Sequence, residues 1–176
     1  MIAATPPACP VHVVGKRIVD ASGQTTYRYP GNFIPRAEVK CSGRVVWVLL
    51  HGGAASSHEL YLGLRSVDSG KTWKLLLAEP YFGIKAPFLI DSYSGPWTIV
   101  GRNAAYFVGW CPVCGSQPHY GTISLTVTQD GGRSFRHYEV PSLAGYTATS
   151  VRVAGDDVTI SGKLRAQTRT ATVEIR

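Results

Sequence analysis

The chain has 176 residues, of which 44% are hydrophobic and only 16% are charged. This composition excludes a disordered chain and a solvated coiled coil, and the length is sufficient for one domain with a hydrophobic core. The formal net charge is +7, but the basic residues are spread along the chain, so we expect no nucleic-acid partner. No stretch approaches the roughly 20 apolar residues of a membrane-spanning helix, and no transmembrane segment is expected.

Short apolar or alternating segments follow one another along the chain and predict β-strands. The predicted strands are 45–50, 59–65, 74–77, 98–100, 105–108, 122–127, 151–153, 158–160 and 170–175. Turn signals rich in glycine separate them, at 42–43, 52–53, 69–70, 94–96, 131–132 and 155–157. Residues 1–30 form a separate N-terminal segment that can contribute one strand. Without a convincing amphipathic helix, the pattern predicts an all-β sandwich, barrel or propeller.

An eight-residue motif occurs twice in the chain. Residues 66–73 read SVDSGKTW and residues 128–135 read TQDGGRSF, so both follow the pattern (S/T)-x-D-x-G-x-(S/T)-(W/F). The aspartates Asp68 and Asp130 are 62 residues apart (130 − 68). This spacing exceeds the roughly 40–45 residues of a propeller blade, and long loops predicted over 51–58 and 109–121 account for the surplus.

The repeated motif resembles the Asp box, or BNR repeat, of the sialidase-like β-propeller family. The resemblance covers residues 31–140 well and residues 141–176 loosely. It implies an Asp-box domain over 31–176 whose antiparallel four-stranded sheets are the blades of a partial propeller. Because six blades need about 250 residues, a chain of this length can supply about three to four.

The resemblance and the chemistry of turns assign a structural role to both motifs. We expect the aspartate to accept hydrogen bonds from turn N–H groups, the glycine to adopt a positive φ, and the second hydroxyl residue to bond back across the turn. The aromatic ring is expected to pack against the hairpin. The structural residues are Ser66, Asp68, Gly70, Thr72 and Trp73 in the first motif, and Thr128, Asp130, Gly132, Ser134 and Phe135 in the second.

The catalytic residues that the resemblance implies are not matched. The family places its motifs at the outer rim, away from a catalytic face with three arginines, a Tyr/Glu nucleophile pair and an aspartate acid/base. Its first arginine lies in an Arg-Ile-Pro motif, but here Phe33 occupies the arginine position and Arg36 follows the proline. The loop expected to carry the aspartate offers His51, His58 and Glu59 instead. We therefore predict no catalytic residue; an active chain would be a sialidase-like glycoside hydrolase.

Four cysteines are present: Cys9, Cys41, Cys111 and Cys114. An even number in a small β-rich chain indicates disulfides and an oxidising compartment, and sequence leaves three pairings open. The C-x-x-C of the last two suits a disulfide, half of a zinc site or a redox dithiol. The disulfide is favoured, because other zinc ligands are scattered and no βαβ pattern accompanies the motif. No metal and no cofactor are predicted.

Three functions remain as alternatives. The first is a non-catalytic Asp-box propeller module of an exported protein, which binds a glycan or a protein partner. The second is part of a sialidase-like glycoside hydrolase, completed by missing sequence or by other subunits. The third is a small lectin whose chains form a homo-oligomeric ring, which would remove exposed sheet edges. Loop aromatics that can stack on sugars are Tyr61, Tyr81, Phe82, Tyr93, Trp97, Trp110 and Tyr120.

The cysteines and the resemblance to the Asp-box family together predict an extracellular or cell-envelope location. The first residues, MIAATPPACP, lack the basic and long apolar regions of a signal peptide. We therefore expect that the export signal is not present in this chain.

Overall fold

The computed structural model describes residues 9–32, 34–55, 58–78, 83–89, 93–110 and 121–175. These residues form strands and one short 3-10 helix, so the all-β prediction is confirmed, and no helix among them is long and apolar enough to cross a membrane. The elements are β1 (Val11–Val14), β2 (Arg17–Asp20), β3 (Thr25–Arg28), β4 (Arg36–Ser42), β5 (Val45–Ala55), β6 (His58–Ser66), β7 (Lys74–Ala78), β8 (Phe88–Leu89), β9 (Tyr93–Val100), β10 (Ala104–Trp110), β11 (Ile123–Thr128), β12 (Arg136–Val140), η2 (Pro141–Leu143), β13 (Thr147–Ala154), β14 (Asp157–Leu164) and β15 (Gln167–Glu174).

The strands form four sheets, which we name A to D in chain order. Sheet A has the order β1-β2-β3, sheet B β4-β5-β6-β7-β8, sheet C β12-β11-β10-β9 and sheet D β13-β14-β15. Neighbouring strands are antiparallel, apart from β8, which is parallel to β7. Four-stranded sheets are predicted, and sheet C has four strands. Sheets A and D have three, and sheet B has a fifth because the short strand β8 adds to its edge.

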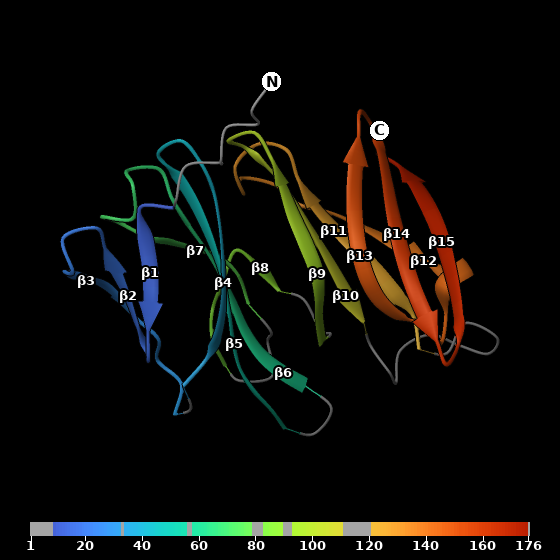
Figure 1. The fold of residues 1–176 in the computed structure, drawn as a ribbon, viewed down its shortest axis with the longest axis horizontal. Helices are drawn as coiled ribbons and strands as arrows, with labels where there is room; N and C mark the ends of the chain where they lie inside the picture. The colour runs from blue at the N-terminus through green and yellow to red at the C-terminus, as the bar shows by residue number, and fades with distance from the viewer. Residues whose placement is uncertain are drawn as a thin grey trace.

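The four sheets stack face to face in an open row. In Figure 1 the row runs from sheet A, in blue, to sheet D, in red, and these two sheets lie at opposite ends. A hydrophobic cluster fills each of the three interfaces between neighbouring sheets. Ile18 and Leu62 belong to the cluster between A and B, Leu77 and Phe107 to that between B and C, and Leu125 to that between C and D.

Strand β5 is buried on both faces, which explains its uninterrupted apolar sequence. Val46, Val48 and Leu50 belong to the cluster shared with sheet A, and Trp47 and Leu49 belong to the cluster shared with sheet C. Successive side chains of a strand point to opposite faces. The apolar run over residues 45–50 therefore predicts a strand between two layers, and the structure has one.

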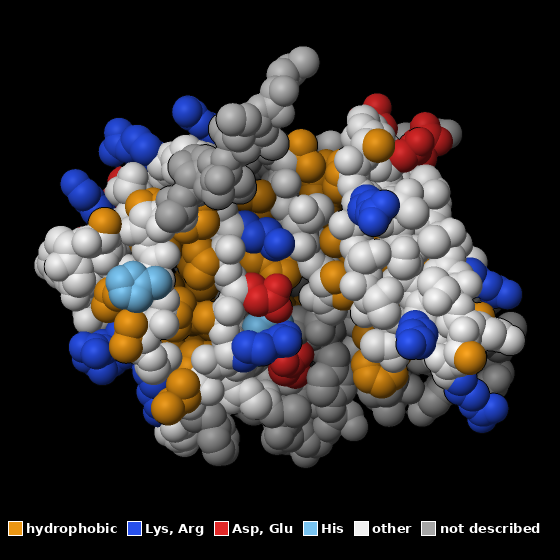
Figure 2. All heavy atoms as spheres, viewed as in Figure 1, with side chains coloured by type: hydrophobic (Ala, Val, Ile, Leu, Met, Phe, Trp, Pro, Cys, Tyr) orange, Lys and Arg blue, Asp and Glu red, His pale blue; other side chains and the backbone are white. Residues whose placement is uncertain are grey.

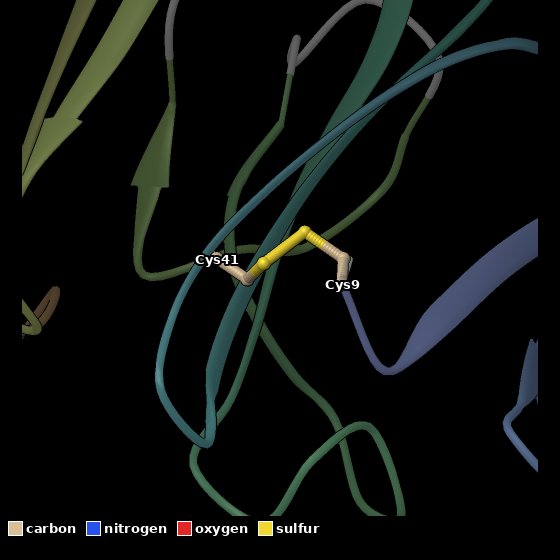
Figure 3. The surroundings of a disulfide bond; sticks show 2 residues. All are labelled: Cys9 and Cys41. Atoms are coloured by element: carbon tan, nitrogen blue, oxygen red, sulfur yellow. A yellow bond between two sulfur atoms is a disulfide. The ribbon is translucent and has the colours of Figure 1, made fainter. Parts of the chain in front are cut away.

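The N-terminal segment forms all of sheet A, where the sequence suggested one strand. Its strands have only four residues each, which is too short for alternation to be distinctive. A disulfide joins Cys9 to Cys41, with a Cα–Cα distance of 5.7 Å, and ties the chain before β1 to strand β4 (Figure 3). The predicted disulfide bonding is thus confirmed for this pair, while Cys111 and Cys114 lie outside the described residues.

The turn predicted at residues 52–53 is wrong. Strand β5 continues to Ala55, and the register of its pairing with β6 shifts between His51 and Ala54. A Cβ on Gly52 would collide with the hydroxyl of Tyr29. The glycine is required by this close approach within a bulged strand, not by a chain reversal. Of the loop predicted over 51–58, residues 51–55 belong to β5 and residue 58 begins β6, while residues 56–57 lie outside the described residues.

The turn predicted at residues 94–96 is wrong for a similar reason. This segment lies inside β9, beside a register shift between Phe107 and Gly109 of strand β10. A Cβ on Gly95 would lie 2.8 Å from the carbonyl oxygen of Val108. A glycine flanked by proline and serine therefore marks a close backbone approach inside the sheet.

Candidate functional site

The first turn motif, residues 66–73, connects β6 to β7 and is closed by its own side chains. Asp68 Oδ1 accepts the backbone N–H groups of Lys71, at 3.1 Å, and of Thr72, at 3.0 Å. Asp68 Oδ2 accepts the hydroxyl of Thr72 at 2.7 Å. The hydroxyl of Ser66 donates to Asp68 Oδ1 at 2.7 Å and accepts the N–H of Gly70 at 2.8 Å. Gly70 has a φ of 84°.

The second turn motif, residues 128–135, connects β11 to β12 and has the same hydrogen bonds. Asp130 Oδ1 accepts the N–H of Arg133 at 2.9 Å and of Ser134 at 3.0 Å, and its Oδ2 accepts the Ser134 hydroxyl at 2.6 Å. The Thr128 hydroxyl donates to Asp130 at 2.9 Å and accepts the N–H of Gly132 at 2.8 Å. Two segments with different residues at six of eight positions thus build one turn geometry.

These hydrogen bonds determine the protonation of both aspartates. The Thr72 hydroxyl, followed by the Thr72 N–H and the Ser66 hydroxyl, holds the pKa of Asp68 well below its usual range. The Ser134 hydroxyl does the same for the pKa of Asp130. A carboxylate that is stabilised in its charged form by several donors has no proton to give at neutral pH. The arrangement therefore suits a turn and does not suit a general acid.

The aromatic residue and the glycine of each motif contact the preceding sheet. The Trp73 indole N–H donates to Thr26 Oγ1 of sheet A at 2.9 Å. Phe135 stacks on Phe88 of sheet B, with ring centroids 4.8 Å apart. A Cβ on Gly70 would collide with Val11 of sheet A. Each motif therefore joins two sheets, whereas the sequence suggested that the ring packs on its own hairpin.

A third turn, between β2 and β3, follows a related scheme that the strict motif misses. Asp20 Oδ1 accepts the N–H and the hydroxyl of Ser22, at 2.9 and 2.6 Å, and the N–H of Gln24 at 3.0 Å. Hydrogen bonding from the Ser22 hydroxyl is the main cause that lowers the pKa of Asp20. Gly23 has a φ of 84°. The sequence signal is the segment DASGQT, in which one more residue separates aspartate from glycine than in the two motifs.

A polar cluster lies between sheets B and C, and we call it the His51 cluster. His51, on β5, has a side chain only 3% exposed, and its two ring nitrogens face two glutamates. Its Nε2 is 3.3 Å from Glu38 Oε1 on β4, and its Nδ1 is 3.2 Å from Glu59 Oε1 on β6. Arg36 Nη2 lies 3.3 Å from Glu38 Oε1, and the Trp97 indole N–H donates to Glu38 Oε2 at 2.9 Å.

The cluster presents charge to solvent mainly through Arg36, whose side chain is 71% exposed. Arg36, Glu38 and Lys40 alternate along β4 and therefore share one face of the strand. Lys40 Nζ lies 5.1 Å from the centre of the Trp97 ring. Figure 2 shows basic, acidic and basic side chains in a line at the centre of this surface, which we call the front face. Both oxygens of Glu38 face donors, so its carboxylate is held in place.

The structure brings together three residues noted in the sequence, Arg36, His51 and Glu59, and adds Glu38, which the sequence did not single out. The sequence pattern that could have indicated Glu38 is the alternation Arg-x-Glu-x-Lys from residue 36 to residue 40. The side chain of His58 lies outside the described residues. Within the described ranges, no three His, Cys, Asp or Glu residues converge in a way that can hold a metal ion.

Among the described residues, the aromatic candidates for sugar stacking are buried or half-buried. Tyr61 and Trp97 are buried, and Trp97 stacks on Phe107 with ring centroids 5.6 Å apart. Trp110 is half-buried. Tyr81, Phe82, Tyr120 and the side chain of Tyr93 lie outside the described residues.

An apolar groove with a volume of about 540 Å³ lies between β1 and β4 on the front face. Figure 2 shows hydrophobic side chains at its floor, between the pale blue histidine and the charged line of β4. Its lining includes Val11, Val13, Ile34, Pro35, Ala37 and Val39. The groove and the charged line therefore run beside each other, on the two sides of strand β4.

No protein-family model matches this chain, and the search of curated proteins finds no match. Its turns, polar cluster and groove are therefore the basis for any functional assignment.

Proposed function

We propose that this chain is a non-catalytic binding module that holds a protein partner on its front face, in a partial propeller of Asp-box sheets. Two observations support the propeller assignment: the shared hydrogen bonds of the two turn motifs, and the four sheets stacked in a row (Figure 1). The observation that carries the binding function is the apolar groove beside the alternating charges of β4.

A protein partner suits this face better than a glycan. Sugar sites use exposed aromatic faces and converging polar groups, but Tyr61 and Trp97 are buried. The groove is lined mainly by aliphatic side chains, and Arg36 beside it is largely exposed. An apolar centre with a charged rim is the usual composition of a protein interface.

The outer face of sheet D supports an open module. On β15, Ala171 and Val173 pack toward sheet C, whereas Thr168, Thr170 and Thr172 are exposed on the other face. Sheets pack through apolar faces, and a polar outer face is typical of the terminal unit of a stacked array. The outer face of sheet A is mixed, because His12 and Arg17 share it with Val14 and Val19. Sheet D therefore favours an open end of the row over a ring of several chains.

The disulfide between Cys9 and Cys41 supports a location in an oxidising compartment. We therefore propose an extracellular or cell-envelope protein. Alkylation of the chain in its native source, followed by mass spectrometry, tests this: the pair should resist alkylation until it is reduced.

A parallel screen tests the binding function. The oxidised chain is immobilised and probed with a glycan array and with a phage library of random peptides. We expect enriched peptides that bind the chain but not the variant Arg36→Glu/Lys40→Glu. The matched control is Arg152→Glu/Lys163→Glu on sheet D, which should bind as the parent does. Peptides that distinguish neither variant, or an empty screen of both libraries, would contradict the proposal.

A second candidate, part of a sialidase-like glycoside hydrolase completed by missing sequence or other subunits, rests on the two glutamates of the His51 cluster. Glycosidases use a carboxyl pair as acid and as base or nucleophile, and Glu38 and Glu59 flank His51. A panel of fluorogenic glycosides, sialosides included, tests it with the parent chain, Glu38→Gln and Glu59→Gln. Turnover that both substitutions abolish would replace the binding module with this enzyme.

A further inference from the structure

Sheets B and C place their four main strands in the same way relative to their turn motifs. In each sheet the motif joins the third strand to the fourth, β6 to β7 and β11 to β12. The backbone N–H of Ser69 donates to the carbonyl of Arg44 at 2.9 Å, and that of Gly131 donates to the carbonyl of Asn103 at 2.9 Å. Arg44 and Asn103 lie in the turn between the first and second strands. The place of the motif therefore shows which strand of its sheet is first, second, third or fourth in chain order.

The Asp20 turn gives the corresponding positions in sheet A. It joins β2 to β3, so these strands are third and fourth, and β1 is second. The directions agree: in Figure 1 the arrow of β1 points the same way as that of β14, the second strand of sheet D, and opposite to that of β13, the first. Among the described residues, sheet A therefore has no first strand, whereas sheets B, C and D have β4, β9 and β13 in that position.

The position of the missing strand coincides with the apolar groove. The groove is lined from one side by β1 and from the other by β4 and the residues before it. Within the described residues β1 pairs only with β2, so its other edge presents backbone groups to the groove. Ile34, at the mouth, is 73% exposed. An unpaired edge beside an apolar floor is the arrangement that accepts an added strand.

Two features of the groove indicate what it accepts. The Cys9–Cys41 disulfide links the chain before β1 to β4, so it holds the two sides at a fixed spacing before anything binds. Basic residues come next to lining residues along the chain, and we call them the rim: Lys16 and Arg17 follow Gly15, and Arg36 follows Pro35. Arg17 and Arg36 are exposed, and Lys16 donates to the carbonyl of Asn32. The nearby carboxylate of Glu38 already faces Arg36, His51 and Trp97. The excess of positive charge favours an occupant with acidic residues.

We propose that the edge of β1 accepts an extended segment of a partner protein, which pairs antiparallel with β1 and completes sheet A as a four-stranded sheet. The segment has β-branched apolar residues at alternate positions, which face the groove, and acidic residues at its ends, which face the basic rim. This inference rests on the proposed protein-binding function and names its binding mode.

A defined peptide tests the mode. The probe is a fluorescein-labelled peptide of about eight residues, with alternating Val and Thr between terminal Glu residues. Its controls carry Pro at alternate positions, which removes backbone donors, or Lys in place of Glu. Fluorescence anisotropy should show saturable binding of the probe and binding about tenfold weaker, or none, for both controls. Amide hydrogen exchange of residues 11–14 should slow by about tenfold or more on binding, because the new strand supplies hydrogen-bond partners.

Ile34→Glu is the matched variant, because its exposed site leaves the fold intact while the added charge opposes the acidic peptide. We expect binding about tenfold weaker. Val100→Glu, at a site 47% exposed at the end of β9, should bind as the parent does. Reduction of the disulfide should also weaken binding, since the two sides are then free to separate.

Three outcomes would overturn the inference. If peptides from the screen bind without slowing amide exchange at residues 11–14, the chain is still a binding module. The proposed pairing of the peptide with β1 is then wrong. A chain that dimerises in light scattering, with those amides protected, would assign the edge to a second copy. Amides of β1 that are protected in the free monomer as strongly as those of β5 would mean that the edge is already paired.

Discussion

The indole N–H of Trp73 donates a hydrogen bond to Thr26 Oγ1, 2.9 Å away and 47 residues earlier in the chain. The last residue of the first turn motif is thus anchored in the preceding sheet. Phe135 is anchored in the same direction, on Phe88 of sheet B. The motifs therefore act as joints between sheets as well as turns within them.

The first prediction concerns this joint. Trp73→Phe keeps an aromatic ring but removes the donor, and it should lower the free energy of unfolding by about 1 kcal/mol, the usual value of such a bond. Urea unfolding measures the change. Thr26→Val should cost a similar amount, and the double variant should cost less than the sum, because the partners share one interaction. Fully additive losses would show that the hydrogen bond contributes nothing.

The second prediction separates backbone strain from steric contact in two glycines with a φ of 84°, Gly70 and Gly23. A Cβ on Gly23 meets nothing within 4 Å, whereas one on Gly70 collides with Val11. Gly23→Ala should destabilise by about 1 kcal/mol, from the left-handed conformation alone. Gly70→Ala should cost about 1–3 kcal/mol more, because it also overpacks the joint between sheets A and B. Equal losses in thermal unfolding would argue against a close approach at this joint.

The third prediction concerns acid stability. The pKa values of Asp68 and Asp130 are lowered in the folded chain by their hydroxyl and N–H donors. A lowered folded pKa adds stability that is present above the unfolded value and is lost as the pH falls through the folded one. The free energy of unfolding should therefore fall from about pH 5 downward. The double variant Asp68→Asn/Asp130→Asn should be less stable at pH 7. Its free energy of unfolding should also fall less steeply as the pH is lowered, and we call this dependence the acid slope.

Thr72→Val provides an independent check on the same slope, because the Thr72 hydroxyl is the largest cause of the lowered Asp68 pKa. Its acid slope should be flatter than that of the parent and steeper than that of the double asparagine variant. A slope that none of these substitutions changes would assign acid unfolding to other groups.

The fourth prediction concerns the disulfide, whose cysteines are 32 residues apart. Closing a loop of this length restricts the unfolded chain and stabilises the folded one by about 3–4 kcal/mol. Cys9→Ser/Cys41→Ser should lose about this amount in urea unfolding. The loss should appear first in sheet A, so amide exchange in β1 and β2 should accelerate more than in β11. A uniform acceleration across all sheets would contradict this local role.

Much of the fold follows from local sequence. The apolar run over 45–50 and the alternating segments after it predict strands because side chains alternate between faces, and the structure has a strand at each of them. The short strands of sheet A carry too few residues for this signal. The turns predicted at Gly52 and Gly95 are wrong because the sequence does not show why a glycine is needed. A glycine that leaves room for a neighbouring segment of the fold looks the same in the sequence as a glycine in a turn.

By itself, the sequence determined the all-β class, the repeated motif and the donors and acceptors within each turn, because all the groups that take part lie within eight residues. Only the tertiary structure decided that Cys9 pairs with Cys41, that four strands assemble the His51 cluster, and that a groove separates β1 from β4. These features join residues far apart in the chain. They depend on the order and spacing in which the sheets stack, which periodicity within a single strand does not encode.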